Sequence, residues 1–205
     1  MKKSILTASI LSALSCGPAY AGHWRVGPDI SYVSGIDDIS KLYERNYNAT
    51  HSSTQADVTV VLPIGLGVQG TYTWDSGVRL DMQLGPLFRM SSNSSQGVDP
   101  HLDHTEVPVS ATLGFTFLPN SSVAPYLRAG FAYHFASGTY VRSANPGLLG
   151  AAGIEFARKS IATYSLEVAT DRSAVEFDRY QSPPSRHDIV KLNTYDWTIS
   201  FIVKF

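Results

Sequence analysis

Apolar and polar residues alternate along most of the chain after residue 22, while the spacing typical of an amphipathic helix is weak. A period of two predicts strands with one apolar and one polar face. Clusters of turn-forming residues interrupt the pattern at intervals. The sequence therefore predicts an all-β chain of about eight strands, each close to or above the roughly 9–11 residues with which a tilted strand crosses a membrane. These strands are expected at residues 24–34, 55–71, 77–90, 104–117, 123–136, 147–157, 161–172 and 193–205.

The connections between the predicted strands alternate in length. Short connections rich in turn residues lie at 72–77, 118–122 and 158–160, and long polar ones lie at 35–54, 91–103, 137–146 and 173–192. All short connections thus fall on one side of the sheet and all long ones on the other. This asymmetry is typical of membrane barrels with periplasmic turns and extracellular loops. We predict an antiparallel up-and-down transmembrane β-barrel over residues 22–205.

Charged residues share one face of the predicted strands. In the last strand, for example, Asp196 and Lys204 lie on the face opposite the apolar one, which is formed by Tyr195, Trp197, Phe201 and Phe205. An Arg or Lys on the lipid face near the membrane centre costs about 2–4 kcal/mol, so the charged face is predicted to line the lumen. The predicted lumen network comprises Arg25, Asp29, Arg79, Asp81, Arg89, Glu106, Arg128, Glu155, Glu167, Asp171, Asp196 and Lys204.

The narrow interior leaves two interpretations of this network. A barrel of about eight strands is just wide enough for its own side chains, so charges of both signs must share a tight space. The first interpretation is a hydrogen-bonded plug of ion pairs. The second is a selective conduction path or a proton-linked gate.

The composition limits the class of protein. A net charge of -1 gives no basic footprint, which excludes nucleic acid as a partner. Charged residues make up 16% of the chain, below the roughly 25% of an ordinary soluble domain. A single Cys excludes a disulfide framework within the chain and a Cys-based structural zinc site, and no cofactor is expected.

The N-terminal residues predict export. Lys2 and Lys3 precede a short apolar run over residues 5–14, and Pro18-Ala19-Tyr20-Ala21 then forms a small-x-small cleavage pattern. This is the pattern of a secretory signal peptide, residues 1–21, that is removed after Ala21. A soluble lipocalin-like barrel, with the apolar face turned inward around a ligand, is the architectural alternative. The sorting of short and long connections favours the membrane barrel.

These features together resemble a known family. The signal peptide, the alternating strands, the segment Leu84-Gly85-Pro86-Leu87-Phe88 and the aromatic last strand are similar to the small eight-stranded outer-membrane barrels of Gram-negative bacteria, the OmpA/OmpX-like and opacity-type surface proteins. The resemblance covers essentially the whole mature chain. It implies contact with outer-membrane lipids and lipopolysaccharide. It also implies that the barrel-assembly machinery recognises an assembly signal formed by Tyr195, Trp197, Phe201 and Phe205.

The resemblance specifies architecture and not activity, because this family includes adhesins, membrane-stabilising proteins and lipid-modifying enzymes. Tyr and Arg suit protein recognition. The long connections supply candidate residues for contact with an extracellular protein or host ligand: Tyr43, Arg45, Tyr47, Arg179, Tyr180 and Arg186. Loops that simply face solvent or lipopolysaccharide are the other interpretation.

The chemistry of the loops supports no specific reaction. A hydrolase would have to use one of two loop clusters, either Asp99, His101, Asp103, His104 and Glu106 or Ser185, His187 and Asp188, and neither has the arrangement associated with lipid A deacylases. We predict no catalytic residue and no metal site. The expected function is that of a non-enzymatic surface protein serving envelope integrity or adhesion. A narrow porin-like channel is the first alternative, and a lipid A or phospholipid hydrolase is the second.

Overall fold

The computed structural model describes residues 22–50, 56–57, 63–91, 93–94, 103–181, 186–193 and 195–205. Eight strands form a closed antiparallel barrel in the order β1, β13, β10, β9, β7, β6, β4 and β3. This confirms the predicted fold class. The barrel strands are β1 (Gly22–Val33), β3 (Ile64–Trp74), β4 (Val78–Ser91), β6 (Asp103–Thr116), β7 (Val123–Gly138), β9 (Gly147–Phe156), β10 (Thr163–Asp171) and β13 (Thr198–Lys204). The predicted signal peptide lies outside the described residues.

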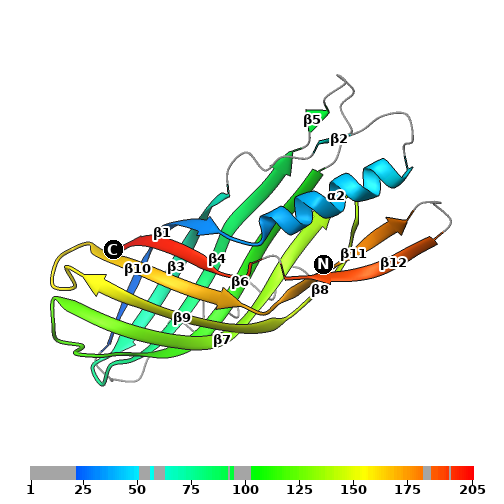
Figure 1. Ribbon diagram of the computed structural model, residues 1–205. Coiled ribbons are helices and arrows are strands. Elements are labelled where there is room, and N and C mark those ends of the chain that lie inside the picture. The colour runs from blue at the N-terminus through cyan, green and yellow to red at the C-terminus, as the bar shows by residue number, and fades with distance from the viewer. Residues whose placement is uncertain are drawn as a thin grey trace, which may run out of the picture.

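The two ends of the barrel differ, as Figure 1 shows. Short turns join β3 to β4, β6 to β7 and β9 to β10 at one end. At the other end lie a helix, α2 (Ile36–Thr50), and three further strands, β8 (Val141–Asn145), β11 (Ala174–Gln181) and β12 (Arg186–Leu192). Two short strands, β2 (Ala56–Asp57) and β5 (Asn93–Ser94), pair with each other. We call α2, β8, β11 and β12 the cap.

The cap corrects the expectation of long irregular loops. Residues 35–54 were predicted to form a polar connection, but α2 occupies most of them because Ile36, Ile39, Tyr43 and Tyr47 recur at helical spacing and are buried. Likewise, most of the predicted loop 173–192 forms the hairpin β11–β12. Strand β11 pairs with both β12 and β8 in a three-stranded sheet. Two barrel strands also begin later than predicted. Strand β3 begins at Ile64 and not at residue 55, and β13 begins at Thr198 and not at residue 193.

The outer wall of the barrel is apolar. Large side chains such as Leu66, Leu113 and Phe131 are 65%, 63% and 66% exposed, and they alternate with buried polar residues along their strands. An apolar surface that encircles a molecule is not stable in water. The wall is therefore suited to contact with lipid. Among the described residues, no helix is long and apolar enough to cross a membrane.

Aromatic side chains mark both ends of this apolar wall. Trp24 and Tyr72 lie 5.0 Å apart near the turns, and Tyr32 and Trp197 lie 5.5 Å apart near the cap. From Trp24 to Tyr32 strand β1 rises about 26 Å at roughly 3.3 Å per residue. A tilt of about 40° reduces this rise to about 20 Å, near the height of the apolar band in outer-membrane barrels. The two aromatic groups therefore delimit a membrane-spanning zone.

The barrel closes where β1 meets β13. Five register pairs, from Asp29 opposite Ile202 to Val33 opposite Thr198, form this junction, compared with eleven between β1 and β3. Val26 and Phe205 add two backbone hydrogen bonds of 3.1 Å. The β1–β13 junction therefore has the shortest ladder in the barrel.

Candidate functional site: the barrel lumen and its cap

Polar side chains fill the lumen in three layers, of which the first lies nearest the turns. The Arg79 guanidinium donates to both carboxylate oxygens of Asp81, at 2.7 and 2.6 Å, and lies 3.4 Å from Glu155. Lys204 donates to Glu155 at 2.7 Å, and Arg158 lies 2.9 Å from the same carboxylate. All five side chains are buried. Together they form a network of both charge signs across the barrel.

Arg25 lies at the turn-side edge of this layer. Its side chain is half-buried and donates to the hydroxyl of Thr163 and to the backbone carbonyl of Arg158. It therefore faces the lumen, although the described residues give it no carboxylate within ion-pair distance. Arg158, which the sequence analysis did not include, takes that place beside Glu155. Because Arg158 lies in a turn, the alternation along the strands assigns its side chain to neither face. The sequence pattern could therefore not place Arg158 in the lumen.

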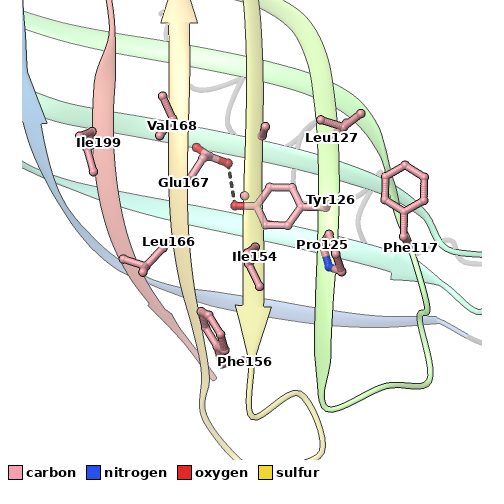
Figure 2. Close-up of a pocket in the computed structure, with 12 residues that line it drawn as sticks. Phe117, Pro125, Tyr126, Leu127, Ile154, Phe156, Leu166, Glu167, Val168 and Ile199 are labelled. Atoms are coloured by element: carbon pink, nitrogen blue, oxygen red, sulfur yellow. Dashed lines mark hydrogen bonds between the residues drawn. The ribbon is translucent and has the colours of Figure 1, made fainter.

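The second layer is centred on Arg128 and Glu167. Arg128 donates to both oxygens of Glu167, at 2.7 and 2.6 Å, and the Tyr126 hydroxyl donates to Glu167 at 2.8 Å. Figure 2 shows the latter bond running from β7 to β10. Arg128 also donates to Thr112 at 3.0 Å and to Gln83 at 3.1 Å. The buried charges of this layer are thus compensated by one another and by neutral hydrogen-bonding groups.

Asp29 joins the second layer through neutral donors. Its carboxylate accepts hydrogen bonds from Gln83 at 3.2 Å and from Ser31 at 3.3 Å. No Arg, Lys or His in the described part of the chain lies within ion-pair distance of it. Asp29 is fully buried, as the alternation of β1 implies. Gln83 links Asp29 to Arg128, so the acid belongs to the network without a direct cationic partner.

The third layer lies next to the cap and contains two histidines that sequence reasoning missed. The His134 imidazole lies between Glu106 and Asp171, with its Nε2 2.8 Å from Asp171. His104 contacts Glu106 at 3.1 Å, and the Tyr43 hydroxyl of α2 lies 3.3 Å from His104. His134 lies at an inward-facing position of β7, and the alternation along this strand could have identified it as a lumen residue. His104 was interpreted as part of a loop cluster instead.

The segment before β13 contradicts two predictions. Asp196 was expected in the lumen, but its side chain is exposed. Tyr195 was expected on the lipid-facing side, but it is 2% exposed, packs edge-on against His134, and donates to the Pro86 carbonyl at 3.0 Å. The reason is that regular pairing begins only at Thr198, so the alternation of β13 does not extend back to these residues. Trp197, Phe201 and Phe205 do face outward, with exposed fractions of 43%, 44% and 64%.

The described residues of the lumen enclose a small cavity. A cavity of about 30 Å³ lies between the second and third layers, lined by Gln83, Ser110, Asp171 and Tyr195 among others. A polar cavity of this size is large enough to hold a water molecule. The larger apolar groove of Figure 2, about 610 Å³, is lined mainly by outward residues such as Leu127, Ile154 and Leu166. That groove belongs to the outer wall rather than to a path through the barrel.

The cap covers the third layer with an apolar core. Tyr43, Phe177, Tyr140 and Val175 pack together there, and Tyr43 contacts Tyr140 and Phe177 edge-on with centroid distances of 5.0 and 6.2 Å. Burial raises the pKa of Tyr43 well above its usual value and that of Tyr140 to about 12. Both phenols therefore stay neutral. The cap has its own core and forms a fixed structure above the barrel.

The cap corrects part of the predicted recognition set. Tyr43 and Tyr47 are buried, so neither can contact an extracellular ligand, and Tyr180 is half-buried. Their helical spacing places them on the inner face of α2. Arg45 and Arg179 are exposed. The side chains of Arg89 and Arg186 lie outside the part of the chain that the structure describes.

A solved structure shares this architecture. The outer membrane protein OprG from Pseudomonas aeruginosa matches with a TM-score of 0.57 and 18% sequence identity, over 91% of this chain and 96% of OprG. The chain has the fold of the small outer-membrane β-barrels. Two further matches are outer membrane protein W of E. coli, with a TM-score of 0.47, 15% identity and coverage of 91% and 97%, and AlkL in lipid bilayers, with 0.47, 10%, 92% and 89%. No protein-family model and no curated protein matches the chain.

At 18% identity the likeness to OprG extends to the fold alone. The small outer-membrane barrel fold accounts for the closed eight-stranded wall and its apolar outer surface. What the protein does must be argued from its own lumen and cap.

Proposed function

We propose that this protein is an integral outer-membrane β-barrel with a closed lumen, and that its folded cap acts at the cell surface without catalysis. The observation that carries the proposal is the filling of the described part of the lumen by three hydrogen-bonded layers, with a cavity of about 30 Å³ between the second and the third. A conducting pore needs a continuous water-filled path. In this barrel an ion would have to separate Arg128 from Glu167, which are joined by two hydrogen bonds.

The cap supplies the surface at which the proposed function takes place. Hydrogen bonds from the Asn46 amide to the Asp178 carbonyl, 2.6 Å, and from the Tyr180 amide to Asn46, 2.9 Å, fix α2 to β11. A surface fixed in this way loses less conformational entropy on binding than a mobile loop does. The proposed roles are recognition of a partner outside the cell and support of envelope integrity.

Conductance tests the closed lumen. Purified protein in planar bilayers is expected to give no discrete conductance steps, and liposomes containing it are expected to take up small solutes no faster than protein-free liposomes. Discrete openings by the unmodified protein would refute the closed lumen and favour the porin-like channel.

Cells test the location and the role of the cap. The protein is expected in the outer-membrane fraction, with an electrophoretic mobility that changes on boiling, as closed membrane barrels show. A variant in which a short Gly-Ser linker replaces residues 36–50 keeps the barrel strands and removes α2. If the cap acts at the surface, this variant will fail to restore detergent resistance or cell attachment to a strain that lacks the protein. Full restoration of both properties would refute a role for α2.

Mass spectrometry tests the non-enzymatic part of the proposal. Overexpression is expected to leave the masses of lipid A and phospholipids unchanged. Ser185 and His187, which a hydrolase would use, have side chains outside the described residues. A new deacylated species that appears with the protein and is lost in S185A would establish the hydrolase instead.

A further inference from the structure

A groove of about 260 Å³ lies between α2 and the β11–β12 hairpin of the cap. Its floor is apolar, with Leu42 buried and Val190 and Leu192 half-buried, and its rim is charged. The rim contains three cationic residues and one acid: Lys41, Arg45, Arg179 and Asp38.

Both walls of the groove are built by regular structure. Residues 38, 41, 42 and 45 lie on one side of α2, since side chains three and four positions apart are neighbours on a helix. In the hairpin, Phe177 pairs with Val190 and Val175 with Leu192, so Val190 and Leu192 share the face of the buried Phe177 and Val175. Arg179 follows Phe177 on that face, because side chains two positions apart in a strand point the same way.

Hydrogen bonds hold the groove open in this form. The two bonds of Asn46 attach α2 to β11 at positions 178 and 180, on either side of Arg179. Asn46 is itself fully buried. The spacing between Arg45 on the helix and Arg179 on the strand is therefore set before any ligand arrives.

The cations of the groove differ from the other cations of the cap. Outside the groove, Arg142 lies 3.4 Å from Asp178, and Lys191 lies 2.9 Å from Glu176. Arg45 and Arg179, in contrast, form no ion pair with any side chain that the structure describes. Within the groove, Lys41 has only an exposed contact of 3.8 Å with Asp38, and such surface pairs contribute little.

The cross-strand neighbour of Arg179 is Asp188, which does not line the groove. Asp188 shares the face of Arg179, and among the residues that line the opening itself three are cations and one is a carboxylate. Guanidinium groups match phosphate oxygens with two parallel hydrogen bonds. The groove is thus complementary to a phosphorylated ligand.

The position of the groove indicates where such a ligand comes from. Tyr32 and Trp197, the aromatic pair at the cap end of the barrel wall, are 45% and 43% exposed. Helix α2 follows directly after β1, which contains Tyr32, and β12 ends just before Trp197. Aromatic pairs of this kind lie at the level of lipid headgroups. Both walls of the groove thus join the barrel wall in the sector of the rim that holds this aromatic pair.

We propose that this groove binds the phosphorylated sugar headgroup of lipopolysaccharide. The inference rests on the proposed placement of the barrel in an outer membrane. Arg45 and Arg179 hold a phosphate, Lys41 adds a third positive charge, and the apolar floor contacts the less polar face of the sugar. A volume of about 260 Å³ lies below the range of about 300–1,000 Å³ for pockets that enclose whole ligands. The groove therefore holds a headgroup while the acyl chains remain in the membrane.

The test measures binding of purified lipid A to the full chain, refolded in nanodiscs of zwitterionic phospholipid free of lipopolysaccharide. Bisphosphorylated lipid A, fully dephosphorylated lipid A and inorganic phosphate are compared as ligands. The variant R45Q/R179Q is expected to bind bisphosphorylated lipid A roughly thirtyfold more weakly, from the effect of two basic groups near an anionic lipid. The matched control R142Q/K191Q removes two cap cations outside the groove and is expected to bind as the unmodified protein does.

Each arm of the experiment has a decisive outcome. Equal affinity of R45Q/R179Q and R142Q/K191Q would overturn the site, and equal binding of dephosphorylated lipid A would overturn phosphate recognition. Full competition by inorganic phosphate at equal concentration would show that a free phosphate, not a lipid, is the ligand. Every sample is also checked for the mobility change on boiling. A missing change in the unmodified protein would refute the proposed membrane barrel itself, whereas an inserted barrel without selective binding would refute this inference alone.

Discussion

Replacing Arg128 with methionine tests whether the charged layers stabilise the barrel as compensated networks. The substitution keeps a long unbranched side chain but removes two hydrogen bonds to Glu167, of 2.7 and 2.6 Å, and those to Thr112 and Gln83. The side chains of Arg128 and Glu167 are 0% and 1% exposed, so water cannot take over the role of the lost cation. Removing one partner of such a buried pair typically costs about 3–5 kcal/mol.

The double variant R128M/E167Q separates loss of charge compensation from loss of packing. Glutamine still accepts the hydrogen bond of Tyr126 but carries no charge. We expect it to recover at least about 2 kcal/mol of the loss, because the largest contribution is the uncompensated carboxylate. Urea titrations in lipid vesicles, followed by the mobility change on boiling, give the free energies of unfolding. If R128M costs less than about 1 kcal/mol, or if E167Q restores nothing, the interpretation of the layer as a compensated charge network is wrong.

Three further predictions concern the wall, the cap core and the cap surface. A Cβ added at Gly153 would lie 2.5 Å from the Tyr126 hydroxyl, whereas one added at Gly150 would meet nothing within 4 Å. Urea titration should therefore show that G153A is destabilised by about 1–3 kcal/mol and that the stability of G150A is nearly unchanged. Y43A opens a cavity in the cap core and should destabilise the cap by about 3–5 kcal/mol; limited proteolysis should then cut the cap while the barrel keeps its mobility change on boiling. Hydrogen bonds from Lys191, Ser143 and Asn145 lower the pKa of Glu176 from 4.5 to about 2. Because this pKa is lower in the folded cap, its contribution to stability is complete above about pH 4.5 and is lost as the pH falls through about 2. A carbon-13 titration of Glu176 that gives a pKa near 4.5 would contradict this.

Strand alternation was sufficient to predict the barrel and most of its inward positions. Lipid on one side and a narrow lumen on the other leave only one face for charges, so Arg79, Arg128, Glu167 and Lys204 could be assigned to the lumen without coordinates. Their partners could not be assigned. Arg79 meets Glu155, which is 76 positions away, because strand tilt and register bring these residues to the same height.

The cap was harder to predict, because its elements are short and polar on one face. The buried residues of α2 recur at helical spacing, but Asp, Lys, Glu, Arg and Asn between them make the segment polar on average. The break before β13 also left no clear signal in the sequence. Tyr195 and Trp197 have the same parity, yet the first is buried and the second is exposed, since pairing with β10 begins only after them.

The short junction between β1 and β13 has a consequence for the order of assembly. Its partners Ser31 and Ser200 are 169 positions apart, whereas every other junction joins strands that follow one another around the barrel in chain order. Bringing such distant segments together has the largest cost in loop-closure entropy. The five register pairs of this junction are also the fewest interstrand contacts available to offset that cost. We expect this junction to form last. Until it does, β1 and β13 each present unpaired backbone groups, which cost several kcal/mol apiece in lipid. Entry into the membrane and closure of the cylinder must therefore be coupled, either as one concerted event or with a temporary strand covering the two open edges.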